Sequence, residues 1–188
     1  MDVMTAIEKR HSCRVFDGRP VPRDVLEKLL YAAAQAPSAR NTQPWRFHVA
    51  VGATREALGE AMTMTTVHLQ EYMDMISSEQ IQYFERFFSD LGKAPVIVAV
   101  TVPQVHEDLD RINTYISAGC ALENLLLAAG EFDVSCCSLT MSFWVRDRLS
   151  EILGVADDWE IVSLVLLGYA AEKPVAPKHA QNIAVFHE

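Results

Sequence analysis

Two long apolar stretches constrain the fold of this chain more than any other feature. They read APVIVAVTV at 94–102 and EIVSLVLLGYA at 160–170, and both are rich in β-branched residues. Continuous runs of this kind, without polar alternation, are typical of strands buried inside a sheet. The chain is therefore expected to build its core on a sheet, with the other elements packed around it.

Helical periodicity and turn residues place the remaining elements. Apolar residues between Val25 and Ala33 recur at helical spacing, and Pro37 ends that helix. Strict alternation of strand and helix is absent, which predicts an α+β fold with helices around one small mixed or antiparallel sheet. We interpret residues 1–188 as a single domain. The expected elements are helices over 3–10, 25–36, 53–90, 108–130 and 145–153, strands over 45–51 and 133–139, and an irregular loop over 36–44.

Composition excludes several classes of protein. The formal net charge is -9, whereas a general nucleic-acid binder normally shows a broad basic face. The four cysteines form no CxxC pair and the histidines lack metal-ligand spacing, so no metal site is predicted. The N-terminus does not read as a signal peptide, and no apolar run reaches the roughly 20 residues of a membrane span. With thiols that suit a reducing cytosol, we expect a cytoplasmic protein.

Three further features are interpreted as structural. Trp45 is expected to anchor the loop before it, and the acidic cluster at 107–110 to cap the helix that begins there. Methionines between Met62 and Met75 are read as core filler, with the wall of a pocket as the alternative. The helix at 108–130 carries apolar residues around most of its circumference, so it is expected to be central and well buried.

The segment EKRHSCR gathers cations in an otherwise acidic chain. Arg10 and Arg14 lie four residues apart, around His11 and Ser12. If the chain turns after Arg10, both guanidinium groups and the Ser12 hydroxyl can converge, which is the donor set that a phosphate requires. An ordinary solvated helix end is the alternative interpretation of this segment.

The surrounding sequence resembles the opening of the FMN-dependent nitroreductase family. The family pattern is R-x-S-x-R/K, then F-x-x-x-P-V, then a helix, then A-P-S-x-x-N-x-Q-P-W-x-F. The stretches SAGCALENLLLAAGEFDV and SLVLLGYAAEKP resemble the family's central helix and last core strand more loosely. The positions that match the opening pattern are Arg10, Ser12, Arg14, Phe16, Pro20, Val21, Ala36, Pro37, Ser38, Asn41, Gln43, Pro44, Trp45 and Phe47.

The resemblance implies FMN at the interface of an intertwined homodimer, with the C-terminal tail extended onto the partner. By position, Arg10, Ser12 and Arg14 would hold the phosphate, ribityl chain and pyrimidine edge, with His11 alongside. Pro37, Ser38 and Asn41 would reach the flavin from the partner subunit. Ser138 and Leu139 would lie near flavin N5, with the register inside 137–142 left open. Lys178 would reach the phosphate.

The same resemblance implies an NAD(P)H oxidoreductase that reduces nitroaromatics, quinones or a related small acceptor by a ping-pong mechanism. The flavin carries the chemistry, so no catalytic side chain is assigned. The chain departs from the family pattern at Ala180, where a basic residue is common, and at Ser138–Ser142, where glycines are common. The alternatives are a module that stores or senses FMN without turnover, and a specialised relative such as a reductive dehalogenase.

Overall fold

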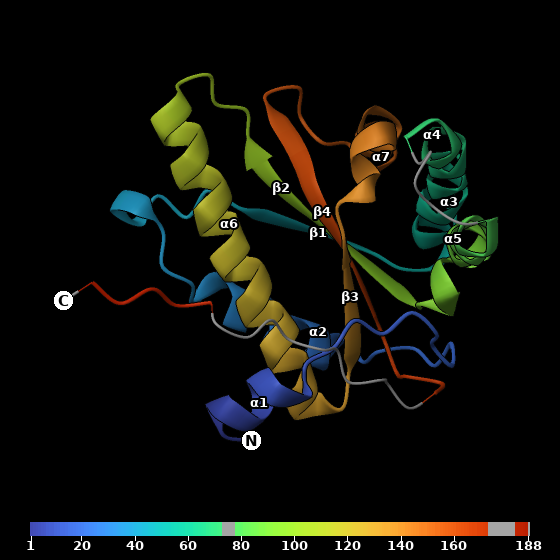
Figure 1. Ribbon diagram of the computed structural model, residues 1–188, viewed down its shortest axis with the longest axis horizontal. Coiled ribbons are helices and arrows are strands. Elements are labelled where there is room, and N and C mark those ends of the chain that lie inside the picture. The colour runs from blue at the N-terminus through green and yellow to red at the C-terminus, as the bar shows by residue number, and fades with distance from the viewer. Residues whose placement is uncertain (73–77, 173–182, 188) are drawn as a thin grey trace.

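The computed structural model describes residues 1–72, 78–172 and 183–187. They form a four-stranded sheet in the order β1-β2-β4-β3, and every neighbouring pair is antiparallel. The two central strands, β2 (Val96–Pro103) and β4 (Trp159–Gly168), are the two apolar stretches of the sequence. The edge strands are β1 (Arg46–Ala50) and β3 (Ser135–Leu139), as Figure 1 shows. The predicted α+β fold is confirmed, with a fully antiparallel sheet.

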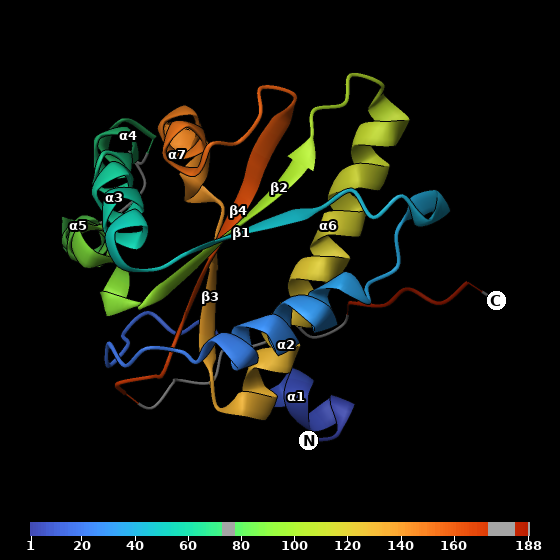
Figure 2. The ribbon, with the colours of Figure 1, turned by 180° about the vertical axis from the view of Figure 1, so that it is seen from behind.

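Helices cover both faces of the sheet, which explains why β2 is apolar throughout. Because side chains alternate along a strand, Val98 packs with α2 (Arg23–Ala34) and α6 (Asp108–Ala129), while Ile97 packs in the opposite core. That second core is built by α3 (Gly52–Thr63), α5 (Ser78–Asp90) and α7 (Arg146–Leu153). Figure 2 shows the two groups of helices on opposite sides of the sheet.

The predicted helix over 53–90 is divided into α3, α4 (Thr65–Tyr72) and α5, and residues 73–77 lie outside the described residues. Within this region Met62 is fully buried, as the core interpretation predicts, but Met64 is 60% exposed. Met73 and Met75 also fall outside the described residues. Trp45 is buried against Ala36 and Ala121, so its predicted role as the anchor of its loop is confirmed.

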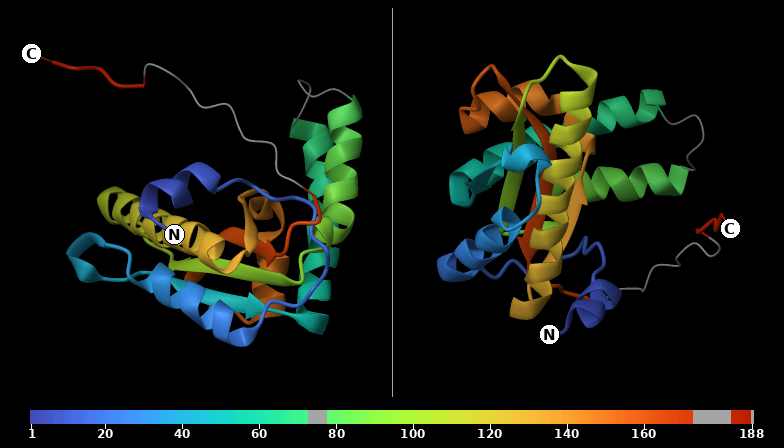
Figure 3. Two further views of the ribbon diagram at one scale, coloured as in Figure 1. Left: turned by 90° about the horizontal axis from the view of Figure 1, so that it is seen from below. Right: turned by 90° about the vertical axis from the view of Figure 1, so that its left-hand side faces the viewer.

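The helix α6 is buried on one flank only. Ala118, Ala121 and Leu125 are buried, whereas Leu109 and Ile116 on the other flank are 69% and 62% exposed. The expectation of burial around most of the helix is therefore wrong within one chain. Figure 3 shows α6 lying along the outside of the sheet rather than at the centre of a bundle.

The N-terminal segment follows the edge of the sheet. After α1 (Val3–Lys9), Ser12 pairs in parallel with Cys136 of β3, and the Cys13 N–H donates to the Cys136 carbonyl at 2.8 Å. Further on, the Phe16 N–H donates to the carbonyl of Gly92 at 2.7 Å. The cation-bearing residues are thus fixed to the core through their own backbone. Among the described residues, none of the helices combines the length and apolar character needed to cross a membrane.

Candidate functional site

The cationic segment begins where α1 ends. Arg10 is the C-cap of α1 and adopts extended backbone angles, so the chain leaves the helix at the residue expected from sequence. The Arg10 guanidinium lies 3.5 Å from the Glu123 carboxylate of α6. Ser12 and Arg14 are both exposed, and no carboxylate of the described chain pairs with Arg14. Two cations and a hydroxyl therefore lie within five residues of extended chain, available to an anion.

His11 carries a buried nitrogen without a partner. Its Nδ1 lies 2.8 Å from the Lys9 carbonyl oxygen and donates to it, which in the neutral ring leaves Nε2 as an acceptor. In the structure as described, Nε2 is buried and makes no hydrogen bond. Such an atom is costly to bury unless something donates to it. His11 also lines a cavity of about 370 Å³ with Lys9, Arg10 and the end of α6.

The loop that carries Ser38 and Asn41 is folded tightly on itself. The Gln43 N–H donates to Ser38 Oγ at 2.9 Å, and the Gln43 side-chain amide donates to Asn41 Oδ1 at 3.1 Å. Arg40 and Asn41 both have positive φ angles, of 53° and 54°. Pro37 is exposed at the start of this loop. The loop presents polar groups that are held by its own hydrogen bonds.

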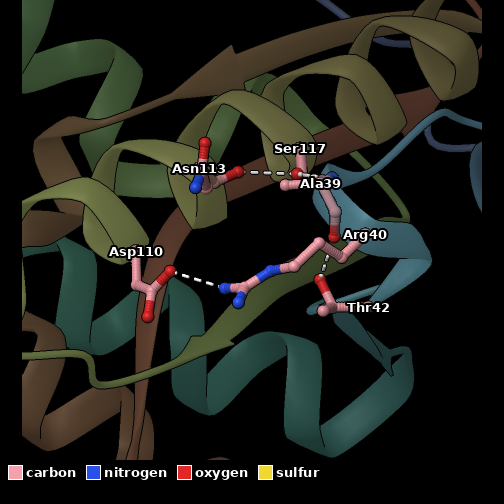
Figure 4. A network of polar contacts seen from close by, with 6 residues as sticks. All are labelled: Ala39, Arg40, Thr42, Asp110, Asn113 and Ser117. Atoms are coloured by element: carbon pink, nitrogen blue, oxygen red, sulfur yellow. Dashed lines mark hydrogen bonds and ion pairs between the residues drawn. The ribbon is translucent and has the colours of Figure 1, made fainter.

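This loop is docked onto the N-terminal half of α6. Arg40 forms an ion pair of 2.6 Å with Asp110, and the Ala39 N–H donates to Ser117 Oγ at 3.3 Å (Figure 4). Asp110 is therefore a partner of the loop and not a helix cap, and Asp108 pairs with Arg111. Glu107 is the N-cap of α6, and Asp108 and Asp110 lie in its first turn, so the acidic cluster stands at the start of the helix as predicted. No side-chain capping hydrogen bond forms there, because neighbouring guanidinium groups take the two Asp carboxylates.

Within one chain, the two halves of the predicted site are far apart. Arg10 contacts α6 at Glu123, and Arg40 contacts it at Asp110, 13 residues earlier. At 1.5 Å per residue this separates the two anchor points by about 20 Å along the helix. Arg10, His11, Ser12 and Arg14 are neighbours in one segment, in which Arg10 and His11 line the cavity of about 370 Å³ and Arg14 lines a hollow beside α5. Within one chain, Pro37, Ser38 and Asn41 are not brought to them.

The third predicted group lies at the end of β3. Ser138 Oγ is 2.9 Å from Ser163 Oγ, and the Ser163 hydroxyl also lies 3.3 Å from the Leu139 carbonyl. The Leu139 side chain is buried in the core, so only its backbone can face a ligand. A cavity of about 500 Å³ adjoins this point, between β4 and α6. Lys178 and Ala180 lie outside the described residues.

Three of the four cysteines, Cys13, Cys136 and Cys137, are buried. All four are free, and burial raises the pKa of the Cys136 thiol to about 12. Burial also raises the pKa of Cys137 and Cys13 above the ordinary value. In the part of the chain that is described, no three His, Cys, Asp or Glu side chains gather in a way that could hold a metal ion. The donors that the segment does present, the guanidinium groups of Arg10 and Arg14 and the Ser12 hydroxyl, are of the kind that binds an anion.

Sequence reasoning missed the residues that hold the cationic segment in place. Leu91, Gly92 and Lys93 have consecutive positive φ angles of 50°, 62° and 62°, and this turn accepts the Phe16 N–H. Arg55 fixes the turn from behind by donating to the carbonyls on either side of it, those of Asp90 and Ala94, at 2.5 and 2.7 Å. No local sequence pattern connects Arg55 with the N-terminal segment. Of these residues, only Gly92 could have been noticed in the sequence, as a glycine that marks a turn.

The fold and the site define a class of protein: an α+β domain with an antiparallel sheet and a cationic segment along the edge of that sheet. The model of the nitroreductase family matches residues 7–169, which is most of the chain. The chain therefore belongs to the nitroreductase family, and the resemblance found in its opening sequence is confirmed.

Individual relatives agree with this assignment. The NADH dehydrogenase of Thermus thermophilus is 31% identical over 199 residues, which cover 92% of this chain and 89% of the relative. The nitrobenzene nitroreductase of Ectopseudomonas oleovorans is 27% identical over 200 residues, covering 87% and 85%. The FMN-dependent nitroreductase NfnB from Mycobacterium smegmatis, solved in complex with NADPH, matches 100% of both chains with a TM-score of 0.82 and 20% identity. This last likeness concerns the fold.

Proposed function

We propose that this protein is an FMN-dependent NAD(P)H oxidoreductase that reduces nitroaromatics, quinones or related small acceptors. The observation that carries the proposal is the segment Arg10–Arg14, whose cations and hydroxyl could bind a phosphate, because this segment lies in a chain of the nitroreductase family. The curated relatives named above are enzymes, which favours turnover over a storage or sensing module. We further propose that residues 1–188 act as one domain, in line with a family match that spans both cores.

The residues present fit FMN. A phosphate dianion would take bidentate donors from Arg10 and Arg14 and a hydroxyl from Ser12. The ion pair of Arg10 with Glu123 is long, at 3.5 Å, and partly exposed, so a phosphate can compete for this guanidinium. The buried Nε2 of His11 needs a donor, and a ribityl hydroxyl is one. When bound, the flavin supplies hydride and electron transfer, and the chain's share is to hold and orient it.

A two-fold homodimer would complete this site. The exposed flank of α6 presents Leu109, Ile112 and Ile116, which are 69%, 54% and 62% exposed, at the i, i+3, i+7 spacing of one helix face. If two copies pair antiparallel along this face, the N-terminal half of one α6 lies beside the C-terminal half of the other. The loop with Pro37, Ser38 and Asn41 then approaches the partner's cationic segment, across the separation of about 20 Å that one chain leaves open.

Two other features support a partner and a reducing location. Ile183, Val185 and Phe186 in the tail are 84%, 79% and 87% exposed, which suits a segment that lies on a second subunit. Four free thiols suit the cytoplasm, where disulfides are rare.

The absorbance spectrum of the purified protein tests the proposed function. We expect a yellow protein whose flavin bleaches with NADH or NADPH under anaerobic conditions and recolours with a quinone or a nitroaromatic. A protein that does not take up added FMN would overturn the proposal. A protein that holds FMN but does not turn over would favour the storage module instead.

The dimer is tested by Ile116→Glu, with Tyr31→Glu as the control. Tyr31 is 69% exposed on α2, so both variants place a charge at an exposed apolar position, but only one lies on the exposed flank of α6. We expect Ile116→Glu to become monomeric in light scattering and to lose FMN, and Tyr31→Glu to do neither. A dimer of unchanged mass in Ile116→Glu would contradict the arrangement.

A further inference from the structure

A positively charged hollow lies on the far side of the cationic segment, between α5, the turn at Leu91–Lys93 and residues 14–17. Its volume is about 450 Å³, and its lining includes Arg14, Arg86 and Lys93 together with Tyr83 and Phe87. Pockets for organic ligands commonly span about 300–1,000 Å³, so the hollow is large enough for one. It is unusual in a chain whose formal net charge is -9.

The cations of this hollow are not neutralised by the described part of the chain. Arg10, Arg23 and Arg40 each have a carboxylate partner, but none of the described ion pairs involves Arg14, Arg86 or Lys93. Two carboxylates also line the hollow. Asp17 is paired with Arg19 at 2.6 Å, and Asp90 accepts the Gly92 N–H at 2.9 Å. The hollow therefore keeps an excess of positive charge.

The lining side chains are held on rigid elements. Tyr83, Arg86, Phe87 and Asp90 recur at i, i+3, i+4 and i+7, which places them on one face of α5. Phe87 is 6% exposed and anchors that face in the core, whereas Tyr83 keeps half of its surface exposed. Lys93 belongs to the turn that Arg55 clamps through two backbone carbonyls. The backbone positions of Arg86 and Lys93 are thus set by α5 and by the clamped turn, and both residues line the hollow beside the Tyr83 ring.

We infer that this hollow binds the phosphate-bearing adenosine end of NAD(P)H. The inference rests on the proposed function and extends it to the site of the electron donor. Because Arg14 is shared with the proposed phosphate site of the flavin, Arg86 and Lys93 are the cations left for the electron donor, and several phosphate charges match this pair better than the single carboxylate of a small acceptor does. The exposed Tyr83 ring offers a surface on which a base can stack. Arg14 belongs to both the hollow and the proposed flavin segment, so the two sites adjoin.

The double variant Arg86→Gln/Lys93→Gln tests the inference, with Arg23→Gln/Lys28→Gln as the control. Both remove two positive charges from exposed positions, and the control pair lies on α2, with side chains 90% and 57% exposed. We expect the test variant to raise the KM for NADPH about tenfold, with FMN content and the rate at saturating donor unchanged. The rise should shrink at high salt, and the control should match the parent.

Two further measurements decide the source of the effect. Calorimetry with adenosine 2′,5′-bisphosphate should show weaker binding to the test variant, and this readout does not depend on turnover. The KM for 4-nitrobenzoate relative to nitrobenzene should not change. Unchanged KM for both NADH and NADPH, or an effect confined to the anionic acceptor, would overturn the inference. Failure of the proposed function is distinguishable, because the parent protein would then show no turnover with any donor.

Discussion

Gly92 gives a sharp test of how the cationic segment is positioned. Its φ is +62°, and a Cβ added there would lie 2.0 Å from the Arg14 carbonyl oxygen and 2.8 Å from the Arg14 carbonyl carbon. Both are backbone atoms, so the contact cannot be relieved by a side-chain rotation. We therefore expect Gly92→Ala to push the turn at Leu91–Lys93 away from the segment that carries Arg14.

The cost has two parts. A left-handed backbone costs a residue with a Cβ about 1–2 kcal/mol relative to glycine. Separating the two backbones also breaks the 2.7 Å hydrogen bond from Phe16 N–H to the Gly92 carbonyl. Phe16 is 1% exposed, so its unpaired N–H would cost a further 1–3 kcal/mol or so, about 3 kcal/mol in total. For a chain of this size, that lowers the melting temperature by roughly 6–12 °C.

Gly154→Ala is the matched control. Gly154 has φ +63°, almost the same as Gly92, but no heavy atom lies within 4 Å of its added Cβ. Urea unfolding of the flavin-free variants should show a loss of about 1–2 kcal/mol for Gly154→Ala and about 3 kcal/mol or more for Gly92→Ala. Only Gly92→Ala should also purify with less FMN. Equal losses of stability and equal flavin content in the two variants would refute the reasoning.

Three other outcomes are expected. Arg14→Ala should purify with much less flavin than the parent, whereas Arg148→Ala on α7 should not; equal flavin content by absorbance counts against the assignment. Asp110→Asn should change the free energy of unfolding by less than about 1 kcal/mol, since the ion pair of Asp110 with Arg40 is exposed. It should nevertheless weaken FMN binding in a fluorescence titration, and an unchanged affinity for FMN would show that the loop does not contribute to the site. Because burial raises the pKa of Cys136 to about 12, the thiolate fraction at pH 8 is on the order of 10⁻⁴. Peptide mapping should find Cys136 unmodified by a thiol reagent in the native protein and modified after unfolding, and labelling of the native thiol would contradict its burial.

The fold could be predicted from sequence wherever the signal was local. The apolar runs fixed β2 and β4, because a strand covered on both faces has no polar side to show. The helix α2 ends shortly before Pro37, and α1 ends just before Arg10, whose backbone is extended; both ends lie close to the expected residues. The segment Arg10–Arg14 could be proposed as a phosphate site because its donors are neighbours in the chain.

The rest depended on contacts between distant residues. Asp110 looks like a helix cap in sequence, and only the folded loop brings Arg40 to it, 70 positions earlier in the chain. The clamp of Arg55 on the turn after α5 joins residues 35 and 39 positions apart. The excess charge around Arg86 and Lys93 exists only because the turn and α5 meet the N-terminal segment. No periodicity or spacing carries such information.

The error over α6 has an instructive physical origin. Its sequence is apolar around most of the helix, which led to the expectation of burial, but a single chain buries only the flank with Ala118, Ala121 and Leu125. In the proposed dimer the exposed flank of α6 would face a partner, which would reconcile the apolar pattern with the exposure seen in one chain. A second copy on Leu109, Ile112 and Ile116 would cover that flank. It would also close the separation of about 20 Å between the two halves of the site, so one contact would account for both discrepancies.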